Sequence, residues 1–295
     1  MKPRIIKPAD HDEWLAEREK GIGASEVGAI LGLSPFETPF SLWLKKTAQV
    51  PREPENMAMK MGHLLEGIVA QLWEEATGEK VIKASAADII YVHPEHDYMR
   101  ATPDRIVRGR KKLLEIKTTV TNVDEDDLPA HWVAQCVFQQ YVTGIHDCDL
   151  AWLVSGRYFG YAHIPYDEEF AEFIANAVTE FWTESVLGGK EPELISVADF
   201  AMKGSEPGKT VEADEEAVRN ICSLRKLNQS ISEREENAEA LKDAIKLYMG
   251  EAETIMYEGK PLATWKSGAK SRTFRLNDKN IEELINEQTE NDNDD

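Results

Sequence analysis

Two acidic residues and a lysine in the middle of the chain have the types and spacing that metal-assisted phosphodiester hydrolysis requires. Asp104 lies in the sequence TPDRI, and Glu115 and Lys117 lie in LEIKTT. Carboxylate oxygens are ligands that Mg²⁺ prefers, and a bound divalent cation activates a water molecule beside it. A neighbouring lysine can orient that water or share in its deprotonation. The same residue types also form ordinary surface ion pairs, so this interpretation depends on the rest of the chain.

The segments that carry these residues are predicted to pair as an antiparallel hairpin. Its two strands and the turn between them are residues 101–107, 112–119 and 108–111. Alternate residues of a strand share one face, so Glu115 and Lys117 point the same way, whereas Ile116 points into the core. With the hairpin in register, Asp104 lies opposite this pair.

Two predicted helices bring further polar side chains toward the same region. An amphipathic helix over residues 59–77 places Glu66 at the edge of its apolar stripe, where a carboxylate is partly desolvated. A helix over residues 129–143 carries Gln135 and Gln139 at helical spacing, and Gln135 lies on the face that should meet the sheet. Glu66 and Gln135 are therefore candidates for the same site. A structural amide at the edge of the core is the alternative for Gln135.

The other periodic segments predict an α/β or α+β core, a mixed central sheet flanked by helices, that ends near residue 200. Further strands are predicted at residues 81–92, 149–155 and 158–164. Further helices are predicted around Trp14, after Gly23, at residues 40–46 and at residues 167–187. Ser25 is the expected N-cap of the helix after Gly23.

A segment rich in glycine at residues 204–208 is the clearest linker, and it divides the chain into predicted domains of residues 1–203 and 204–295. The second domain is expected to contain a long charged helix, a small β-hairpin that turns at residues 258–259, and a disordered acidic tail from Asn286. Apolar residues of the long helix fall at heptad-like positions. That spacing fits a coiled coil and a helix packed on the core domain equally well.

Composition narrows the class of protein. The 295 residues carry a formal net charge of −20, which repels nucleic acid, so DNA binding requires a local basic cluster such as that at residues 100–117. Cys136, Cys148 and Cys222 lack the spacing of a zinc site, an iron–sulfur cluster or a disulfide framework. The chain has no long apolar run and no apolar N-terminal segment, so we expect a cytoplasmic protein without a membrane segment.

Five motifs occur in a fixed order within about residues 10–200. They are GIGASEVGAILGLSPF (21–36), MGHLLE (61–66), TPDRI (102–106), LEIKTT (114–119) and AQCVFQQYVTG (134–144). Each motif alone is weak, but the ordered set resembles the YqaJ-type phage recombination exonucleases, relatives of phage lambda exonuclease in the PD-(D/E)xK nuclease superfamily. The resemblance implies a restriction-endonuclease-like core for this part of the chain.

The resemblance also implies roles for individual residues. The implied ligands of Mg²⁺, or of Mn²⁺ in its place, are Asp104, Glu115, Glu66 and the backbone carbonyl of Ile116. Lys117 corresponds to the superfamily's motif lysine, and Gln135 corresponds to the glutamine that touches the nucleophilic water or that lysine. We expect the three carboxylates to converge on one cation position. The implied ligands of a DNA 5′-phosphate are Arg18, Ser25 and Thr102, with Thr102 in the place of a serine.

The function that the resemblance implies is a Mg²⁺-dependent 5′-to-3′ exonuclease on duplex DNA ends, which leaves 3′ single-stranded overhangs for recombination. It further implies a single-strand annealing protein as partner, a ring-shaped homo-oligomer, and a phage or prophage origin in a bacterial host cell. Two alternatives stay open: an endonucleolytic or structure-specific nuclease with the same site, and a catalytically silent DNA-end-binding protein. The presence of Asp104, Glu115 and Lys117 together disfavours the silent protein.

Overall fold

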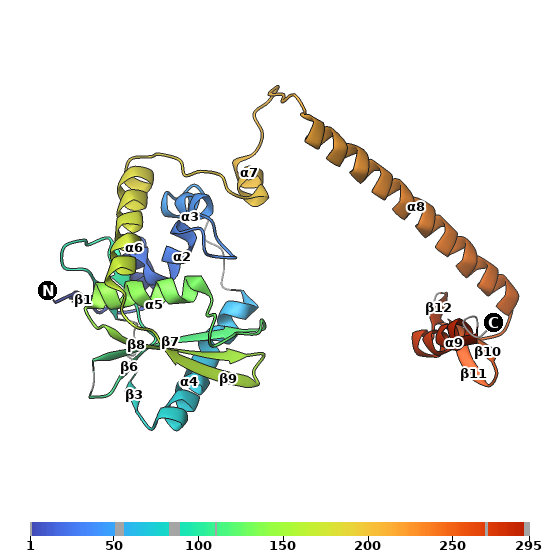
Figure 1. Ribbon diagram of the computed structural model, residues 1–295, viewed down its shortest axis with the longest axis horizontal. Helices are drawn as coiled ribbons and strands as arrows, with labels where there is room; N and C mark the ends of the chain where they lie inside the picture. The colour runs from blue at the N-terminus through green and yellow to red at the C-terminus, as the bar shows by residue number, and fades with distance from the viewer. Residues whose placement is uncertain (1, 51–55, 83–88, 110, 269–270, 292–295) are drawn as a thin grey trace. The chain divides into compact units, whose positions relative to one another are not determined.

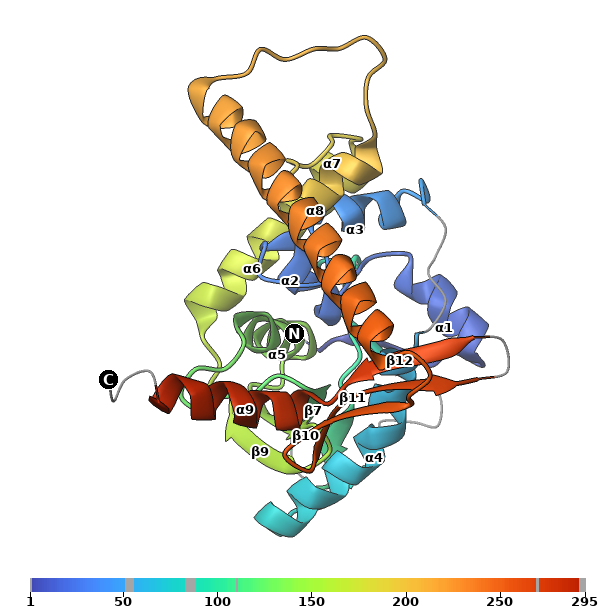
Figure 2. The ribbon, with the colours of Figure 1, turned by 90° about the vertical axis from the view of Figure 1, so that its right-hand side faces the viewer.

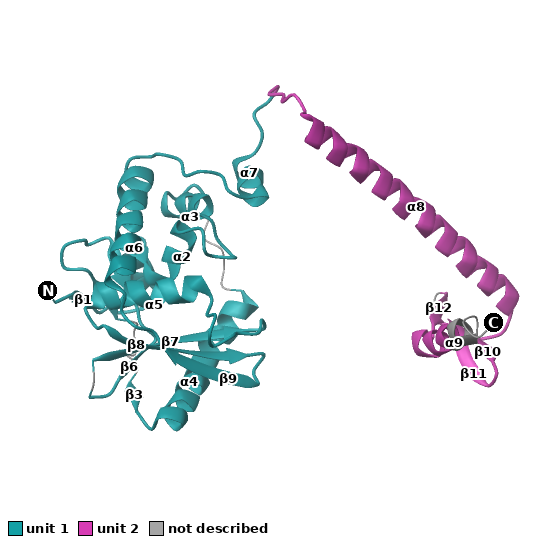
Figure 3. Ribbon diagram, in the orientation of Figure 1, with its two compact units in different colours: residues 1–207 teal, residues 208–295 magenta. Residues whose placement is uncertain are grey.

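The computed structural model describes residues 2–50, 56–82, 89–109, 111–268 and 271–291, the last of these without the side chains of 287–291 (Figure 1). Contacts divide it into two compact units, Met1–Pro207 and Gly208–Asp295, which are described separately (Figure 3). The assignment of an exonuclease domain and an extension to these parts stays a prediction.

Unit 1 is built on two mixed sheets. The five-stranded sheet has the order β3-β6-β7-β8-β9, in which β7 and β8 run parallel and the other neighbours run antiparallel. Its strands are β3 (Val81–Ile82), β6 (Arg105–Val107), β7 (Lys112–Thr119), β8 (Asp147–Val154) and β9 (Tyr158–His163). The second sheet has the order β1-β4-β5-β2. Its strands are β1 (Arg4–Ile6), β4 (Ile90–Val92), β5 (Met99–Ala101) and β2 (Ile22–Gly23).

Helices cover both faces of the five-stranded sheet. Helix α4 lies on one face and α5 on the other, and α6 packs on α5 (Figure 1). The helical segments of unit 1 are α1 (His11–Arg18), the 3₁₀ turn η1 (Ala24–Glu26), α2 (Val27–Ile30), α3 (Pro39–Lys46), α4 (Met57–Thr77), α5 (Ala130–Thr143), α6 (Glu168–Glu180), the π-helical η2 (Phe181–Leu187) and α7 (Val197–Lys203). The predicted α+β class, a mixed sheet flanked by helices, is confirmed.

The alternation of side chains along β7 separates the core into two parts. Leu114 and Ile116 pack with Val69 and Trp73 of α4, whereas Leu113 belongs to the larger cluster on the α5 side. Glu115 and Lys117 share the parity of Leu113 and face α5, as the alternation predicts. The strand therefore buries apolar side chains on one face while its other face supplies polar groups to a site.

Helix α4 begins at Met57, two residues before the predicted start, and ends at Thr77, before Gly78, as predicted. The Asn56 side chain accepts a hydrogen bond from the Met59 amide at the first turn, and Gly78 ends the helix with a φ of 72°. Its predicted apolar stripe is only partly buried, since Ile68 is 52% exposed. The predicted strand over residues 81–92 is present only at its two ends, as β3 and β4, and residues 83–88 lie outside the described part of the chain.

Unit 2 consists of a long helix and a small three-stranded sheet with a helix beside it (Figure 2). Its elements are α8 (Glu215–Met249), β10 (Thr254–Tyr257), β11 (Lys260–Ser267), β12 (Arg272–Leu276) and α9 (Asp278–Asn291). The hairpin predicted at residues 258–259 is confirmed, and both turn residues have positive φ. Strand β12 and helix α9 were not predicted. The prediction of disorder from Asn286 is wrong as far as Asn291, and residues 292–295 lie outside the description.

One arginine ties the parts of unit 2 together. The Arg272 guanidinium lies 3.8 Å from the centroid of the Trp265 ring and donates hydrogen bonds to the carbonyls of Gly250 and Ala252. It thereby joins β12 to the connection between α8 and β10. Among the helices that the structure describes, none combines the length and the apolar character needed to cross a membrane.

Candidate active site

The predicted first strand of the hairpin, residues 101–107, is interrupted at Asp104, the proposed metal ligand. Strand β6 begins only at Arg105, which pairs with Leu114 of β7. Continuing this register places Pro103 opposite Ile116, and proline has no N–H to donate to the ladder. Instead, the Ile116 amide donates a hydrogen bond of 2.8 Å to Oδ2 of Asp104. The sequence Pro-Asp therefore prevents β6 from starting before Arg105. The Asp104 carboxylate takes the place of a backbone carbonyl as the acceptor for the Ile116 amide.

This break also leaves the Ile116 carbonyl at an open strand edge. A strand residue directs its N–H and C=O to the same side, so the Ile116 carbonyl points toward the side on which Asp104 lies. Pro103 cannot pair with it, and Ile116 lines the same cavity as Asp104. The role of this carbonyl as a cation ligand stays a prediction.

Glu115 is the centre of a hydrogen-bond network between β7 and α5. Its Oε1 accepts from Nζ of Lys117 at 2.8 Å and from Nε2 of Gln135 at 2.5 Å. Its Oε2 accepts from Nε2 of Gln139 at 2.8 Å. The Gln135 Oε1 in turn accepts from Nζ of Lys117 at 2.7 Å. Because Glu115 is only 3% exposed, these three donors compensate a carboxylate that has lost most of its water.

Glu66 reaches the same region from α4. Its Oε2 lies 3.4 Å from Nη1 of Arg105, which also donates to the Asp104 carbonyl at 2.7 Å. Glu66 is near enough to Asp104 to contribute to raising that residue's pKa. The site therefore holds three carboxylates and two cations, the second cation being Arg105, which the sequence interpretation did not include.

The charges of the site perturb two of its members. Burial, the Glu115 carboxylate and the Glu66 carboxylate together raise the pKa of Asp104 well above its ordinary range, and Lys117 opposes this effect. Burial alone would lower the pKa of Lys117. The Glu115 and Asp104 carboxylates outweigh burial and raise the pKa of Lys117 above its ordinary value. Lys117 is therefore held as an ammonium group at neutral pH.

One cavity of about 880 Å³ joins all the predicted site residues. Its lining includes Arg18, Ser25, Glu66, Thr102, Asp104, Glu115, Ile116, Lys117 and Gln135. Although the whole chain is strongly acidic, the lining also contains several cations. They are Arg18, Lys45, Arg100, Arg105 and Lys117. The cavity thus combines a carboxylate cluster with several cations, each of which is also paired with a glutamate, as Arg18 is with Glu26 and Lys45 with Glu37. These cations are the groups that could attract a polyanionic substrate.

Arg18 and Ser25 meet at a second part of this cavity. Nη2 of Arg18 donates a hydrogen bond of 3.3 Å to Oγ of Ser25. The expectation that Ser25 is an N-cap is wrong, because Gly23 precedes η1 and Ser25 lies inside it. The Glu26 side chain accepts from the Gly23 amide and so takes the capping role. Thr102 lines the same cavity.

A buried arginine fixes helix α1, which carries Arg18. Nη1 of Arg100, in β5, donates to the Glu17 carbonyl at 2.8 Å and to its Oε2 at 3.0 Å. Strand β5 leads directly to Thr102, so this contact fixes the position of Arg18 relative to Thr102.

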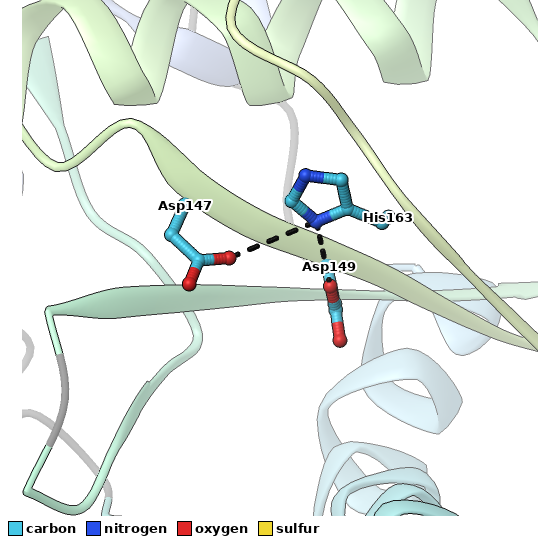
Figure 4. A group of neighbouring side chains, drawn as sticks. All are labelled: Asp147, Asp149 and His163. Atoms are coloured by element: carbon cyan, nitrogen blue, oxygen red, sulfur yellow. Dashed lines mark hydrogen bonds and ion pairs between the residues drawn. The ribbon is translucent and has the colours of Figure 1, made fainter.

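A separate group of ligand-type side chains lies on the α4 side of the sheet (Figure 4). The ligand atoms of Asp147, Asp149 and His163 all lie within 4.8 Å of one another, close enough to hold a metal ion. However, Nζ of Lys112 lies 2.8 Å from Oδ2 of Asp149, and the Trp73 indole donates to the same oxygen. An ammonium group thus already compensates the charge of Asp149. Asp149 faces α4, whereas Glu115 faces α5 on the other side of the sheet.

Among the described residues, Asp147, Asp149 and His163 are the one group of this kind. The convergence of Asp104, Glu115 and Glu66 on one cation position stays a prediction, and Glu66 is paired with Arg105. The donor set itself fits Mg²⁺ or Mn²⁺, since it consists of carboxylate and carbonyl oxygens around a cavity that admits water.

Comparison with known proteins identifies the family. Residues 13–146 match the YqaJ-like viral recombinase domain. The chain is 36% identical over 282 residues to the uncharacterized protein YqaJ of Bacillus subtilis (strain 168), and the match covers 90% of this chain and 87% of that protein. The chain belongs to the YqaJ-like viral recombinase family.

Solved structures share the fold of this YqaJ-like chain. The alkaline exonuclease LHK-Exo of Laribacter hongkongensis matches with a TM-score of 0.50 at 22% identity, over 59% of this chain and 92% of that one. A putative exonuclease of Eubacterium rectale matches with a TM-score of 0.50 at 9% identity, over 70% and 97% of the two chains. The fold of the YqaJ-like chain is therefore that of known exonucleases, as the motifs imply.

Three residues of the site were not assigned from the sequence. Gln139 binds Glu115 directly, Arg105 pairs with Glu66, and Arg100 anchors α1. The spacing of Gln139 from Gln135, one helical turn, was a visible signal for the first. No sequence pattern indicated the partners of the two arginines, because both contacts join segments far apart in the chain.

Proposed function

We propose that this protein is a metal-dependent exonuclease that hydrolyses duplex DNA from its ends. The observation that carries the proposal is the network in which Glu115 accepts from Lys117 and Gln135, beside Asp104, in one cavity. Fold similarity to exonucleases and membership of a viral recombinase family support it.

The cation of this site would be held by carboxylate and carbonyl oxygens. The residues that would hold it are Asp104, Glu115, Glu66 and the Ile116 carbonyl. A bound Mg²⁺ or Mn²⁺ would supply an activated water and absorb the negative charge that develops on the phosphate. Glu66 contacts Arg105 through Oε2 at 3.4 Å, so Arg105 would remain beside this ligand.

The side chains around the cation position the reactants. Lys117, held as an ammonium group, is a donor to the attacking water or to a phosphate oxygen, so its role here is to orient and to stabilise charge. Gln135 fixes that ammonium group, because its Oε1 accepts from Nζ of Lys117 at 2.7 Å. Asp104 is fixed in turn by the Ile116 amide. These contacts hold the polar groups in place before substrate arrives.

The Arg18 and Ser25 part of the cavity is proposed to bind the 5′-terminal phosphate, with Thr102 as a third donor. Arginine and hydroxyl groups suit a phosphate dianion. A terminal phosphate held at this place would set the first phosphodiester bond beside Glu115 and Lys117. Degradation would then begin at the 5′ end and leave a 3′ single-stranded overhang.

The biological setting is part of the same proposal. The family description, a viral recombinase, supports a role in phage-type recombination in a bacterial cytoplasm, in which an annealing protein receives the 3′ overhang. A ring-shaped homo-oligomer would place the cavity toward DNA and the acidic surface toward solvent. Sedimentation of the protein with and without DNA tests the oligomer.

One digestion experiment tests the activity. Linear duplexes with a 5′-phosphate or a 5′-hydroxyl, and closed circular DNA, are incubated with Mg²⁺ or with EDTA, and products from each labelled end are followed. We expect loss of the 5′-phosphorylated strand in Mg²⁺ only, with closed circles intact. Cleavage of closed circles would indicate an endonuclease instead. If no Mg²⁺-dependent product forms while DNA ends are still bound, the protein is an end-binding protein.

A further inference from the structure

Gln139 is a buried amide with a function in the site that its sequence position alone did not assign. It lies one turn after Gln135 in α5 and is 0% exposed. Its Nε2 donates a hydrogen bond of 2.8 Å to Oε2 of Glu115, while Gln135 donates to Oε1 of the same carboxylate. Two amides from one helix face thus hold the two oxygens of one carboxylate.

Counting acceptor positions shows what this pair achieves. Each carboxylate oxygen offers two lone pairs. Oε1 of Glu115 already accepts from Lys117 and from Gln135, so its positions are filled. Among the described residues, Gln139 alone donates to Oε2, which leaves one of its two acceptor positions for a cation. The arrangement prevents rotation of the carboxylate and makes Oε2 the oxygen that can bind a cation.

Gln139 differs from its neighbour Gln140 in the group to which its side-chain amide donates. Gln140 is also 0% exposed, and Oε1 of both glutamines is buried without a hydrogen-bond partner in the described part of the chain. The Gln140 amide, however, donates to the backbone carbonyls of His146 and Ile164. Gln140 therefore supports the backbone, whereas Gln139 acts on a charged group of the site.

We propose that Gln139 is a positioning residue of the metal site, which holds Glu115 so that Oε2 is presented to a divalent cation. This role rests on the proposed function, since it requires Glu115 to be a ligand. Groups that orient metal ligands through hydrogen bonds contribute to metal affinity, and their loss typically weakens binding about 10- to 100-fold.

The test is a calorimetric titration of the full chain with Mn²⁺. The variants are Gln139→Met, Gln140→Met as the matched control, and Asp104→Asn, which identifies heat from any other Mn²⁺ site such as the Asp147, Asp149 and His163 group. We expect Gln139→Met to weaken the Asp104-dependent binding about 10- to 100-fold. Gln140→Met should leave the affinity unchanged while lowering the unfolding temperature measured in EDTA. The Mg²⁺ concentration for half-maximal hydrolysis should rise for Gln139→Met alone.

If Gln139→Met does not fold, a second variant tests the same role. Gln139→Asn keeps an amide in the pocket but withdraws it from Glu115 by one methylene group, so it should weaken Mn²⁺ binding in the same direction. A folded Gln139 variant that binds Mn²⁺ with wild-type affinity overturns the positioning role alone. A wild-type chain that shows no Asp104-dependent Mn²⁺ binding overturns the metal site itself, and the role of Gln139 with it.

Discussion

At the scale of single residues, the charges of the site lower the stability of the folded protein when no cation is bound. Three carboxylates, on Asp104, Glu115 and Glu66, face two cations, Lys117 and Arg105. Burial and the neighbouring carboxylates raise the pKa of Asp104, which means that the folded state resists its ionisation. Such an arrangement costs stability and suits a group that binds a cation.

Asp104→Asn is expected to raise the unfolding temperature in EDTA and to abolish hydrolysis. A carboxyl whose pKa is raised on folding contributes stability only below its unfolded pKa, and that contribution is lost as pH rises through the folded pKa. The Asp104 carboxyl group thus lowers the stability of the folded protein at neutral pH. The asparagine carbonyl oxygen can still accept from the Ile116 amide. An increase of about 1 kcal/mol in the free energy of unfolding would raise the unfolding temperature by about 2–4 °C.

Calorimetry of both proteins from pH 4 to pH 8 in EDTA measures this effect. The difference between variant and wild type should be largest at neutral pH and should shrink as pH falls, because the wild-type Asp104 then becomes protonated. An Asp104→Asn protein less stable than wild type at neutral pH would contradict the assignment of this loss of stability to Asp104.

Lys117→Met is expected to lower the single-turnover rate of DNA hydrolysis by about 10²- to 10³-fold, the usual cost of losing one donor that stabilises developing negative charge. It should also lower stability in EDTA by about 1.5–3 kcal/mol, because Glu115 loses a charged donor. Lys112→Met is the matched control: Lys112 lies on the same strand but pairs with Asp149 on the other face. Hydrolysis at the wild-type rate by Lys117→Met would remove Lys117 from the mechanism.

Arg18→Gln is expected to reduce the preference for a 5′-phosphorylated end over a 5′-hydroxyl end. Loss of one charge-assisted hydrogen bond corresponds to roughly 10- to 100-fold in rate on the phosphorylated duplex. The rate on the 5′-hydroxyl duplex should change little. Arg157→Gln, in the exposed turn between β8 and β9, is the control. An equal loss on both duplexes would mean that Arg18 only supports the fold.

At the scale of elements, most of the site could be predicted from sequence because its residues lie on strongly patterned segments. Helix α5, strand β7 and the end of α4 at Gly78 follow periodicity and capping rules. The error at residues 102–104 has a local cause, since Pro103 stops the ladder within a segment whose composition favours a strand. The charge pairs of Arg100 and Arg105 could not be predicted, because they depend on tertiary contacts between distant segments.

Two further differences have physical explanations. Ser25 is a favourable N-cap by type, but the Glu26 carboxylate reaches the Gly23 amide and Ser25 is left to bind Arg18. Helix α9 contains Ile281, Leu284 and Ile285 at helical spacing, and it packs on β11. The density of acidic residues around these apolar positions obscured that pattern.

Pro103→Ala tests the break in β6 at the scale of the element. Alanine restores a backbone N–H opposite the Ile116 carbonyl, so the ladder can continue and the carbonyl becomes engaged. Hydrolysis should fall, by up to about 10²-fold if the site shifts by roughly 1 Å. Hydrogen exchange should show new protection at residue 103. A variant without that protection and with wild-type activity would show that proline is not needed to open the strand edge.

At the scale of the whole molecule, the described site is confined to unit 1. Every residue that lines the cavity precedes residue 140, and the two hydrophobic clusters that support it lie within Met1–Pro207. Unit 2 has its own small sheet and its own anchor at Arg272. The residues of the proposed site therefore all belong to the first unit, whereas helix α8 of the second unit carries exposed apolar residues such as Leu224 and Leu227.

A chain ended after Pro207 is accordingly expected to fold and to hydrolyse linear duplex DNA in Mg²⁺ at a rate per site comparable to that of the full chain. Because the cut falls between the compact units, unit 1 keeps its own core, and its unfolding temperature in EDTA should stay close to that of the first transition of the full chain. Single-turnover hydrolysis at saturating enzyme measures the chemistry apart from DNA affinity. Loss of single-turnover activity in a truncated chain that still folds would place part of the working site in residues 208–295.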